Sequence, residues 1–332
     1  MIDFKYHLVS IIAVFLALAV GLVVGATALS GPALALLQKA ETKVNHENAA
    51  LLKGRQALQN QVSADQLFGA AAAPRLLPGL LADQKVVLVV AYNAAGTVTT
   101  GLTTALHQAG ATVTGTVTLN QQFLDTSGAN EAHLKELAQK LAHDARVPLP
   151  PQLSGPVGAQ QAAAQVLAAS LLTTGGPGLP SADSRAILSG LSQGGFITVS
   201  NGPNPPPPAS LAVLVTPGGP PPQAGSEVLV ATAVALRNAG SGTVMAGAVQ
   251  SVGPLSVISA EVDAGQVSTV DNADTELGQI MTVQALRQLL DHKPAGQFGI
   301  GAQAVPTPAP TPSVPPTPAP TPSTSAHTGG HK

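Results

Sequence analysis

The pattern of apolar positions divides the chain into a continuous N-terminal block and a later series of short alternating runs. Residues 8–28 read LVSIIAVFLALAVGLVVGATA and contain no ionisable side chain. At about 1.5 Å per residue, a helix of this length spans about 31 Å, which matches the ~30 Å hydrocarbon core of a bilayer. The block therefore predicts a transmembrane helix within residues 1–31.

Two interpretations of this block remain open. Residues 26–28 (ATA) fit the processing site of a cleaved signal peptide. The apolar run is longer than the ~7–15 residues of a signal-peptide core, and a helical pattern follows it directly, so we expect an uncleaved signal anchor. Lys5 precedes the block while Lys39 and Lys43 follow it, so nearby charge does not decide the orientation. We expect the large C-terminal part to lie outside the cytoplasm, because such domains translocate largely regardless of charge.

Small residues recur every four positions inside the block, at Ala13, Ala17, Gly21 and Gly25. This spacing places them on one face of the helix, where a second helix can approach closely and pack. The general abundance of alanine and glycine in the chain explains the same pattern without any contact. A membrane helix packing face and a chance pattern are thus both open.

Residues 32–70 predict a helical stalk. Leu37, Val44, Leu51 and Leu58 lie seven residues apart, which is the heptad spacing of a coiled-coil seam. The companion positions 34, 41, 48, 55 and 62 are partly polar, and Gly54 weakens the helix, so we expect a short, marginal coiled coil. A membrane anchor would concentrate the chains and favour a homodimer. The alternative is a lone amphipathic helix packed on its own domain.

Residues 71–301 predict an α/β domain. An apolar run at 84–92, a helical pattern at 97–109 and a β-branched run at 111–119 form a strand–helix–strand unit, which implies a parallel sheet. Further elements are expected as strands at 196–200, 211–216, 243–249 and 267–270, and as helices near 134–141, 226–238 and 275–290. This alternation predicts a Rossmann-like, doubly wound, mainly parallel sheet. Residues 302–332 are rich in Pro, Thr and Ala and predict a disordered tail.

Composition excludes several classes of protein. Charged residues make up 10% of the chain and the net charge is −2, so no basic face is available for general nucleic-acid binding. The absence of cysteine excludes a disulfide scaffold, a thiolate zinc site, an iron–sulfur cluster and a cysteine nucleophile.

The search for catalytic motifs gives a negative result. Residues 190–194 (GLSQG) match G-x-S-x-G, but the expected helix precedes the serine and the strand follows it, which reverses the order of a nucleophile elbow. No phosphate-binding glycine loop follows the first strand, and there is no H-E-x-x-H. We therefore expect no enzyme activity, no catalytic residues and no bound cofactor.

Metal ligands are equally sparse. Asp271, Asp274 and Glu276 could hold a cation, but Asp274 as a helix cap and Glu276 at the helix N-terminus explain them better. The histidines are scattered, and the three methionines show no paired spacing. We expect no metal site.

Three stretches carry a resemblance to a known family. The opening MIDFKYHLVSIIAVFLALAVGLVVG, residues 85–119 and residues 268–290 resemble the actinobacterial copper-transport outer-membrane protein family of the MctB type, over roughly residues 1–300. The resemblance implies a role in copper transport or homeostasis at the cell envelope, with an outer-membrane location among the options. The resemblance identifies no residues that would bind copper. It is also the only reason to consider copper as a ligand of this chain.

The residues and the resemblance together predict a membrane-anchored envelope protein with an extracytoplasmic domain. We expect it to act with protein partners rather than as a β-barrel pore, because few segments show barrel periodicity. A related branch of the family gives the alternative, a non-catalytic scaffold in cell division that helps to activate a peptidoglycan hydrolase.

Overall fold

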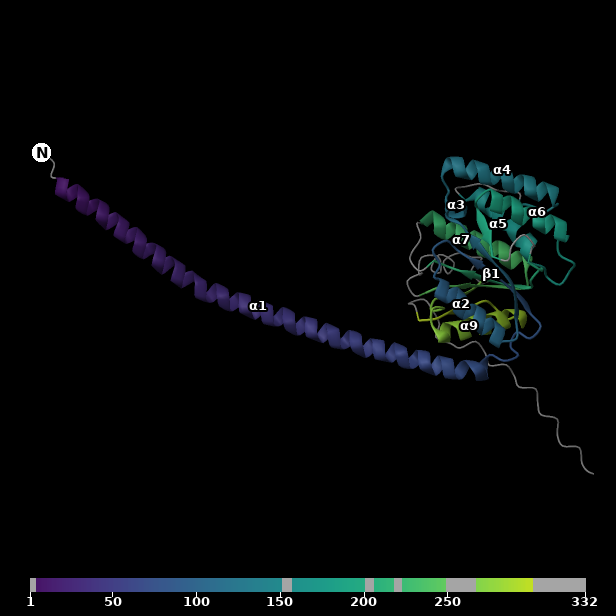
Figure 1. The fold of residues 1–332 in the computed structure, drawn as a ribbon, viewed down its shortest axis with the longest axis horizontal. Coiled ribbons are helices and arrows are strands. Elements are labelled where there is room, and N and C mark those ends of the chain that lie inside the picture. The colour runs from purple at the N-terminus through teal and green to yellow at the C-terminus, as the bar shows by residue number, and fades with distance from the viewer. Residues whose placement is uncertain (1–3, 151–156, 201–205, 218–222, 249–266, 301–332) are drawn as a thin grey trace, which may run out of the picture. The chain divides into compact units, whose positions relative to one another are not determined.

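A computed structural model describes residues 4–150, 157–200, 206–217, 223–248 and 267–300. Helix α1 (Phe4–Leu76) opens the chain and is 73 residues long (Figure 1). Contacts divide the chain into two compact units, Met1–Asp65 and Gln66–Lys332, which we describe separately. The first unit is the greater part of α1. The second contains the end of α1 and an α/β domain.

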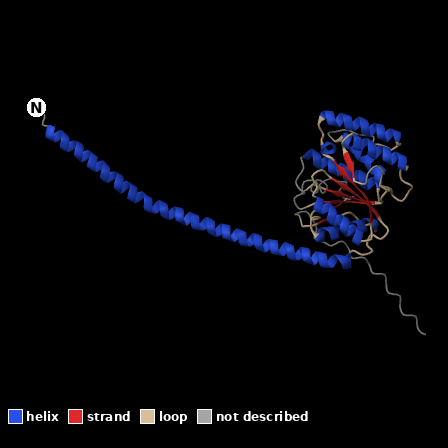
Figure 2. Cartoon of the chain, in the orientation of Figure 1, coloured by secondary structure: helices blue, strands red, loops and turns tan. Residues whose placement is uncertain are grey.

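The second unit alternates strands and helices (Figure 2). After α1 come β1 (Lys85–Val90), α2 (Gly96–Gln108), β2 (Thr112–Leu119), α3 (Gln121–Leu124), α4 (Gly128–Asp144), α5 (Gly158–Leu171) and α6 (Ser181–Gln193). Then follow β3 (Ile197–Val199), β4 (Leu211–Val215), α7 (Gln223–Ala239), β5 (Gly242–Ala246), β6 (Ser268–Val270), α9 (Glu276–Leu290) and β7 (Gln297–Phe298).

The strands form one seven-stranded sheet in the order β3-β2-β1-β4-β5-β6-β7. All neighbouring pairs are parallel except β2 and β3, which are antiparallel. The central register sets Val87 of β1 beside Ala212 of β4 and Gly115 of β2. The mixed α/β class and the mainly parallel sheet predicted from the sequence are confirmed.

Helices cover both faces of this sheet, and the strand sequences explain why. In β1, Val87 and Val89 join a core with α4, α5, α6 and α7, whereas Val86 and Leu88 join a second core with α2, α9 and the end of α1. Side chains alternate across a strand, so a strand buried on both faces must be apolar at every position. The run VVLVV meets this requirement.

The structure differs from the sequence expectations at α1, α3, α5 and β7. Helix α1 continues through Gly31 and Pro32, where we expected the span to give way to a separate stalk helix. Helices α3 and α5 and strand β7 were not expected. Almost every side of α5 is buried, so its sequence GAQQAAAQVLAASL shows no polar face that would mark a helix. The predicted tail at 302–332 lies outside the described residues.

Candidate functional site: the apolar span and the stalk face of helix α1

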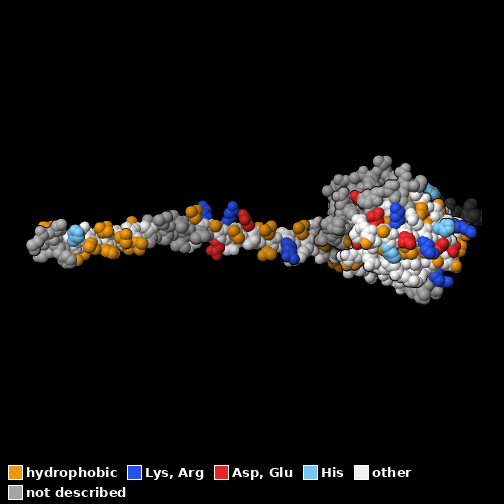
Figure 3. Space-filling model, turned by 90° about the horizontal axis from the view of Figure 1, so that it is seen from above, with side chains coloured by type: hydrophobic (Ala, Val, Ile, Leu, Met, Phe, Trp, Pro, Cys, Tyr) orange, Lys and Arg blue, Asp and Glu red, His pale blue; other side chains and the backbone are white. Residues whose placement is uncertain are grey.

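The N-terminal part of α1 is long and apolar enough to cross a membrane. The segment Tyr6–Gly25 has a mean hydropathy of 2.9 and none of it is buried within the protein. In Figure 3, hydrophobic side chains run along this segment, and Lys, Arg, Asp and Glu side chains are drawn further along α1. A helix of this composition needs an apolar surrounding, because its large side chains stay exposed, as Leu22 (73%) and Phe15 (67%) show.

The row of small residues lies on this apolar segment. Ala13, Ala17 and Gly21 are exposed, and Gly25 is half-buried. A methyl group added at Gly21 or Gly25 would meet no atom within 4 Å. The face is thus open to another helix, although no contact within the described chain uses it, so the packing role stays a prediction.

The stalk positions are also exposed. Val44 is 53% exposed, Leu51 71% and Leu58 64%. Each side chain projects from α1, and no other described residue packs over it. The side chain of Leu37 lies outside the described residues. Apolar side chains repeated at heptad spacing and left in water indicate a surface that another helix can cover.

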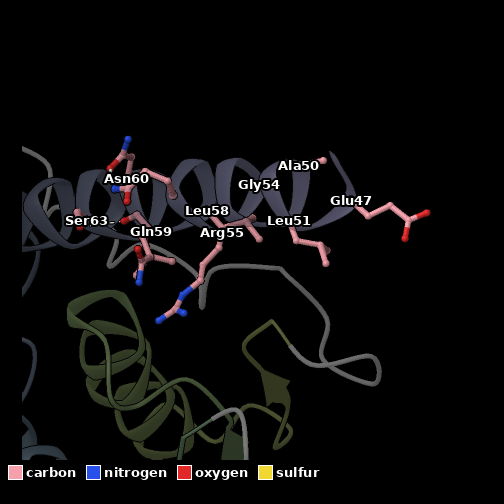
Figure 4. Close-up of a pocket in the computed structure, with 11 residues that line it drawn as sticks. Glu47, Ala50, Leu51, Gly54, Arg55, Leu58, Gln59, Asn60 and Ser63 are labelled. Carbon is pink, nitrogen blue, oxygen red and sulfur yellow. Dashed lines mark hydrogen bonds between the residues drawn. The ribbon is translucent and has the colours of Figure 1, made fainter. Parts of the chain in front are cut away.

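A shallow depression follows the same stretch of α1 (Figure 4). Every residue that lines it belongs to α1, between Glu47 and Ser63. Leu51 and Arg55 extend to one side in the close-up, while Ala50 and Asn60 point to the other (Figure 4). A methyl group at Gly54 would meet nothing within 4 Å, so this depression is an open helix face rather than an enclosed cavity.

In the second unit, the turn between β6 and α9 holds the acidic residues that we considered as cation ligands. Asp271 Oδ1 accepts a hydrogen bond from the backbone N–H of Ile300 (2.8 Å). The cap of α9 is Thr275, whose hydroxyl accepts from the N–H of Gly278 (3.1 Å), so the cap predicted at Asp274 is wrong by one residue. Glu276 occupies the first turn of α9, where its charge complements the helix dipole.

Among the described residues, no three His, Cys, Asp or Glu side chains lie close enough to hold a metal ion. The histidines take other positions: His133, for example, stacks on Phe196 with ring centroids 5.6 Å apart. Met245 is fully buried in β5. The described residues therefore form no cluster of three His, Cys, Asp or Glu ligands, although imidazole is a side chain that copper binds well.

The G-x-S-x-G match has a structural explanation. Ser192 lies near the end of α6, and β3 begins after it, which is the order that the sequence predicted. A methyl group at Gly190 would lie 3.1 Å from the side chain of Leu141, and one at Gly194 would overlap Phe196. The two glycines therefore allow close packing around α6, and the serine does not sit on a nucleophile elbow.

The carboxyl end of β1 is where an α/β sheet of this kind usually binds ligands, because β2 and β4 leave β1 in opposite directions. Here α2 begins after Ala95, and no side chain caps it. Tyr92 is 40% exposed beside it. Asp271 follows β6 at the carboxyl edge of the same sheet, and its Oδ1 accepts a hydrogen bond from the backbone N–H of Ile300.

Sequence reasoning missed two features of the second unit. The end of α1 packs on α9 at Gly69, where an added methyl group would overlap Glu276. Asn272 is buried, and its side-chain oxygen has no hydrogen-bond partner among the described residues. Gly69, a glycine inside a helix, was the sequence signal for the contact between α1 and α9. Nothing in the sequence indicates that Asn272 is buried.

These observations define the class of protein. It combines an apolar N-terminal helix of membrane-spanning length, an exposed stalk face and an α/β domain. A sequence model of the family described as "Copper transport outer membrane protein, MctB" matches residues 1–308. The chain belongs to this family, as its resemblance predicted.

Its relatives match over nearly their whole length. The copper transporter MctB of Mycobacterium leprae is 33% identical over 322 residues, covering 93% of this chain and 100% of that protein. The copper transporter MctB of Mycobacterium tuberculosis H37Rv is 31% identical over 315 residues, covering 92% and 98%. These names favour copper transport over the division-scaffold alternative.

Proposed function

We propose that this chain is a membrane-anchored cell-envelope protein that takes part in copper transport or homeostasis by assembling with protein partners. The observation that carries the proposal is the family match over residues 1–308. Relatives named copper transporters, matched over more than nine-tenths of each chain, support the same role. The apolar segment Tyr6–Gly25 supports anchoring.

We further propose that the protein contributes no catalysis. The serine of the G-x-S-x-G match lies at the end of α6 and its neighbouring glycines serve packing. The described residues also gather no group of metal ligands. Copper would then be handled by an assembly, to which this chain brings a Rossmann-like domain and a coiled-coil stalk.

Self-association is part of the proposal. The small residues at positions 13, 17, 21 and 25 offer a face for a neighbouring helix in the membrane. The exposed positions Val44, Leu51 and Leu58 offer a second face on the stalk. We expect each face to bring two copies of the chain together on its own, and nucleic acid to play no part, because the chain carries a net charge of −2.

The copper content of cells tests the function. We expect cells that lack this chain to accumulate copper when copper is added to the medium, and expression of the full chain to restore the normal level. Mass spectrometry of washed cells measures copper, and zinc in the same samples is the control. Equal copper in the two strains at every dose would refute the copper role.

The orientation can be tested because the chain has no cysteine. Glu136 is exposed on α4, so Glu136→Cys introduces one accessible thiol into the domain. If the domain is extracytoplasmic, a membrane-impermeant maleimide should label this variant in intact cells. Labelling only after lysis would place the domain in the cytoplasm.

A further inference from the structure

The stalk face of α1 carries charged residues among its apolar positions, and these charges affect which helix can pack against it and in which direction. Seven exposed residues, three or four apart, form what we call the stalk seam. Polar and apolar members alternate from Glu41 to Leu58, and the two charged residues, Glu41 and Arg55, lie seven residues on either side of Asn48. The seam consists of Glu41, Val44, Asn48, Leu51, Arg55, Leu58 and Val62.

A parallel, in-register pair of stalks brings each seam residue against its own counterpart. Glu41 would then face the Glu41 of the second copy, and Arg55 would face the other Arg55. Like charges at the centre of a coiled coil repel each other and lose hydration. The stalk seam is therefore poorly suited to parallel self-pairing.

We propose that the stalk seam binds a second copy of this chain in the antiparallel direction. In that direction, one register sets Glu41 opposite Leu58, Val44 opposite Arg55 and Asn48 opposite Leu51 of the other copy. Glu41 then lies one layer, about 4.5 Å along the axis, from the second copy's Arg55. The symmetry of the pair repeats this contact, so both opposite-charge pairs form.

The same register brings the two Asn48 side chains into neighbouring layers at the centre of the pair. Their amides can donate to and accept from each other, which satisfies two polar groups that a seam would otherwise bury unpaired. A buried asparagine of this kind fixes register at some cost in stability. Moving the pairing by one heptad so that Glu41 lies opposite Asp65 separates Glu41 from Arg55. The opposite shift keeps the charge and asparagine contacts in neighbouring layers but sets Arg55 opposite Leu37, outside the seam.

The pairing has a consequence that rests on the proposed membrane anchoring. The pair would carry its apolar segments at opposite ends. About 24 residues separate Gly25 from the centre of the seam, so the two segments would lie roughly 70 Å apart at about 1.5 Å per residue. Such a pair would connect two facing membrane surfaces rather than two neighbours in one membrane.

Charge reversal in the full-length protein in detergent tests the pairing. Glu41→Arg alone sets arginine beside the second copy's Arg55, so we expect self-association to weaken by about tenfold or more. Adding Arg55→Glu in the same chain should restore it, because both pairs re-form with the charges exchanged. Sedimentation equilibrium measures the dissociation constant.

Lys53→Glu is the matched control, since Lys53 is exposed on α1 and lies outside the seam. It should leave the constant unchanged. In a parallel pair Glu41→Arg exchanges one like-charge pair for another, so an unchanged constant for that variant would overturn the proposal. A monomer at all concentrations would overturn it as well.

Cross-linking reads the direction itself, using the absence of native cysteine. A mixture of Ala40→Cys chains with Gln61→Cys chains should give a mixed disulfide on mild oxidation, because the antiparallel register brings these flanking positions together. Self-linking of Val44→Cys would show the parallel arrangement and overturn the proposal. Neither measurement involves copper or a membrane, so failure of the proposed function would leave both results interpretable.

Discussion

Gly278 lies in the first turn of α9, where the helix passes over the preceding turn. A methyl group built at this position overlaps the backbone carbonyl of Asn272 and closely approaches the N–H of Ala273. That carbonyl already accepts two hydrogen bonds from Thr275, through its backbone N–H (3.0 Å) and its hydroxyl (2.8 Å). Backbone held this firmly cannot shift to admit a side chain.

Gly278→Ala should therefore destabilise the domain by about 2–3 kcal/mol, the upper part of the ~1–3 kcal/mol that overpacking typically costs, because this site cannot relax. Chemical denaturation of the full chain, followed by circular dichroism, gives the free energy of unfolding. Gly128→Ala in α4 is the control, because its added methyl group meets nothing within 4 Å, and it should be neutral or slightly stabilising. Equal effects from the two substitutions would contradict the close contact.

Thr275 provides the N-terminal cap of α9 through its hydroxyl. Thr275→Ala removes the acceptor for the N–H of Gly278, and we expect a loss of about 1 kcal/mol in unfolding free energy. Thr275→Ser keeps the hydroxyl and should retain most of the stability. If Asp274→Ala proved as costly as Thr275→Ala, the assignment of the cap would be wrong.

Lys140 and Asp144 form an exposed pair on α4 with a hydrogen bond of 2.8 Å. That hydrogen bond lowers the pKa of Asp144 and raises the pKa of Lys140. Folding lowers the pKa of Asp144. The pair therefore stabilises α4 fully at pH values above the pKa that Asp144 has in the unfolded chain. This stabilisation is lost as the pH falls through the lower pKa that Asp144 has in the folded chain. Lys140→Gln should raise the pKa of Asp144 in an NMR titration, and an unchanged value would contradict the pairing.

At the scale of elements, a strand or helix could be predicted when its burial produced a recognisable pattern of apolar and polar residues. Strands β1, β4 and β5 were predictable because parallel strands buried on both faces need continuous apolar runs. Helix α5 was not, since an alanine-rich helix buried on nearly all sides has no polar face. The cap of α9 was misplaced to Asp274 because two adjacent residues could both cap, and only the backbone geometry selects Thr275.

The sequence was enough to locate the residues of the candidate site, but not to tell whether they are exposed or which elements lie next to them. The apolar block and the heptad positions were visible as spacing, and the structure adds that Val44, Leu51 and Leu58 are exposed. The junction at Gly69 was not visible, because a helix glycine alone does not say which element approaches it. Its neighbour, α9, lies about 200 residues further along the chain.

Gly69→Leu tests this junction between the end of α1 and α9. A methyl group there would overlap Cβ of Glu276 and lie 3.3 Å from the backbone nitrogen of Leu277, so a leucine should separate the two helices. We expect a loss of about 2 kcal/mol in the unfolding free energy of the domain. Hydrogen exchange should show faster exchange in residues 69–77. Ala70→Leu, on an exposed position of the same turn, should change neither quantity.

At the scale of the whole molecule, the chain joins a helix that carries an apolar segment to a domain whose core is complete on both faces of its sheet. The family match spans both parts, from residue 1 to residue 308. A role that depended on the domain alone would not need the apolar helix. We therefore expect copper handling to require the tether as well as the domain.

The most direct test measures cell copper with and without that tether. In cells that lack the native protein, the full chain should restore the normal copper level. A chain that begins at Gln66 behind a cleavable secretion signal should not, although it is secreted and folded. Exchanging Tyr6–Gly25 for another membrane-spanning helix that keeps small residues at positions 13, 17, 21 and 25 should restore the function again. Normal copper in cells that secrete only the untethered domain would contradict the account.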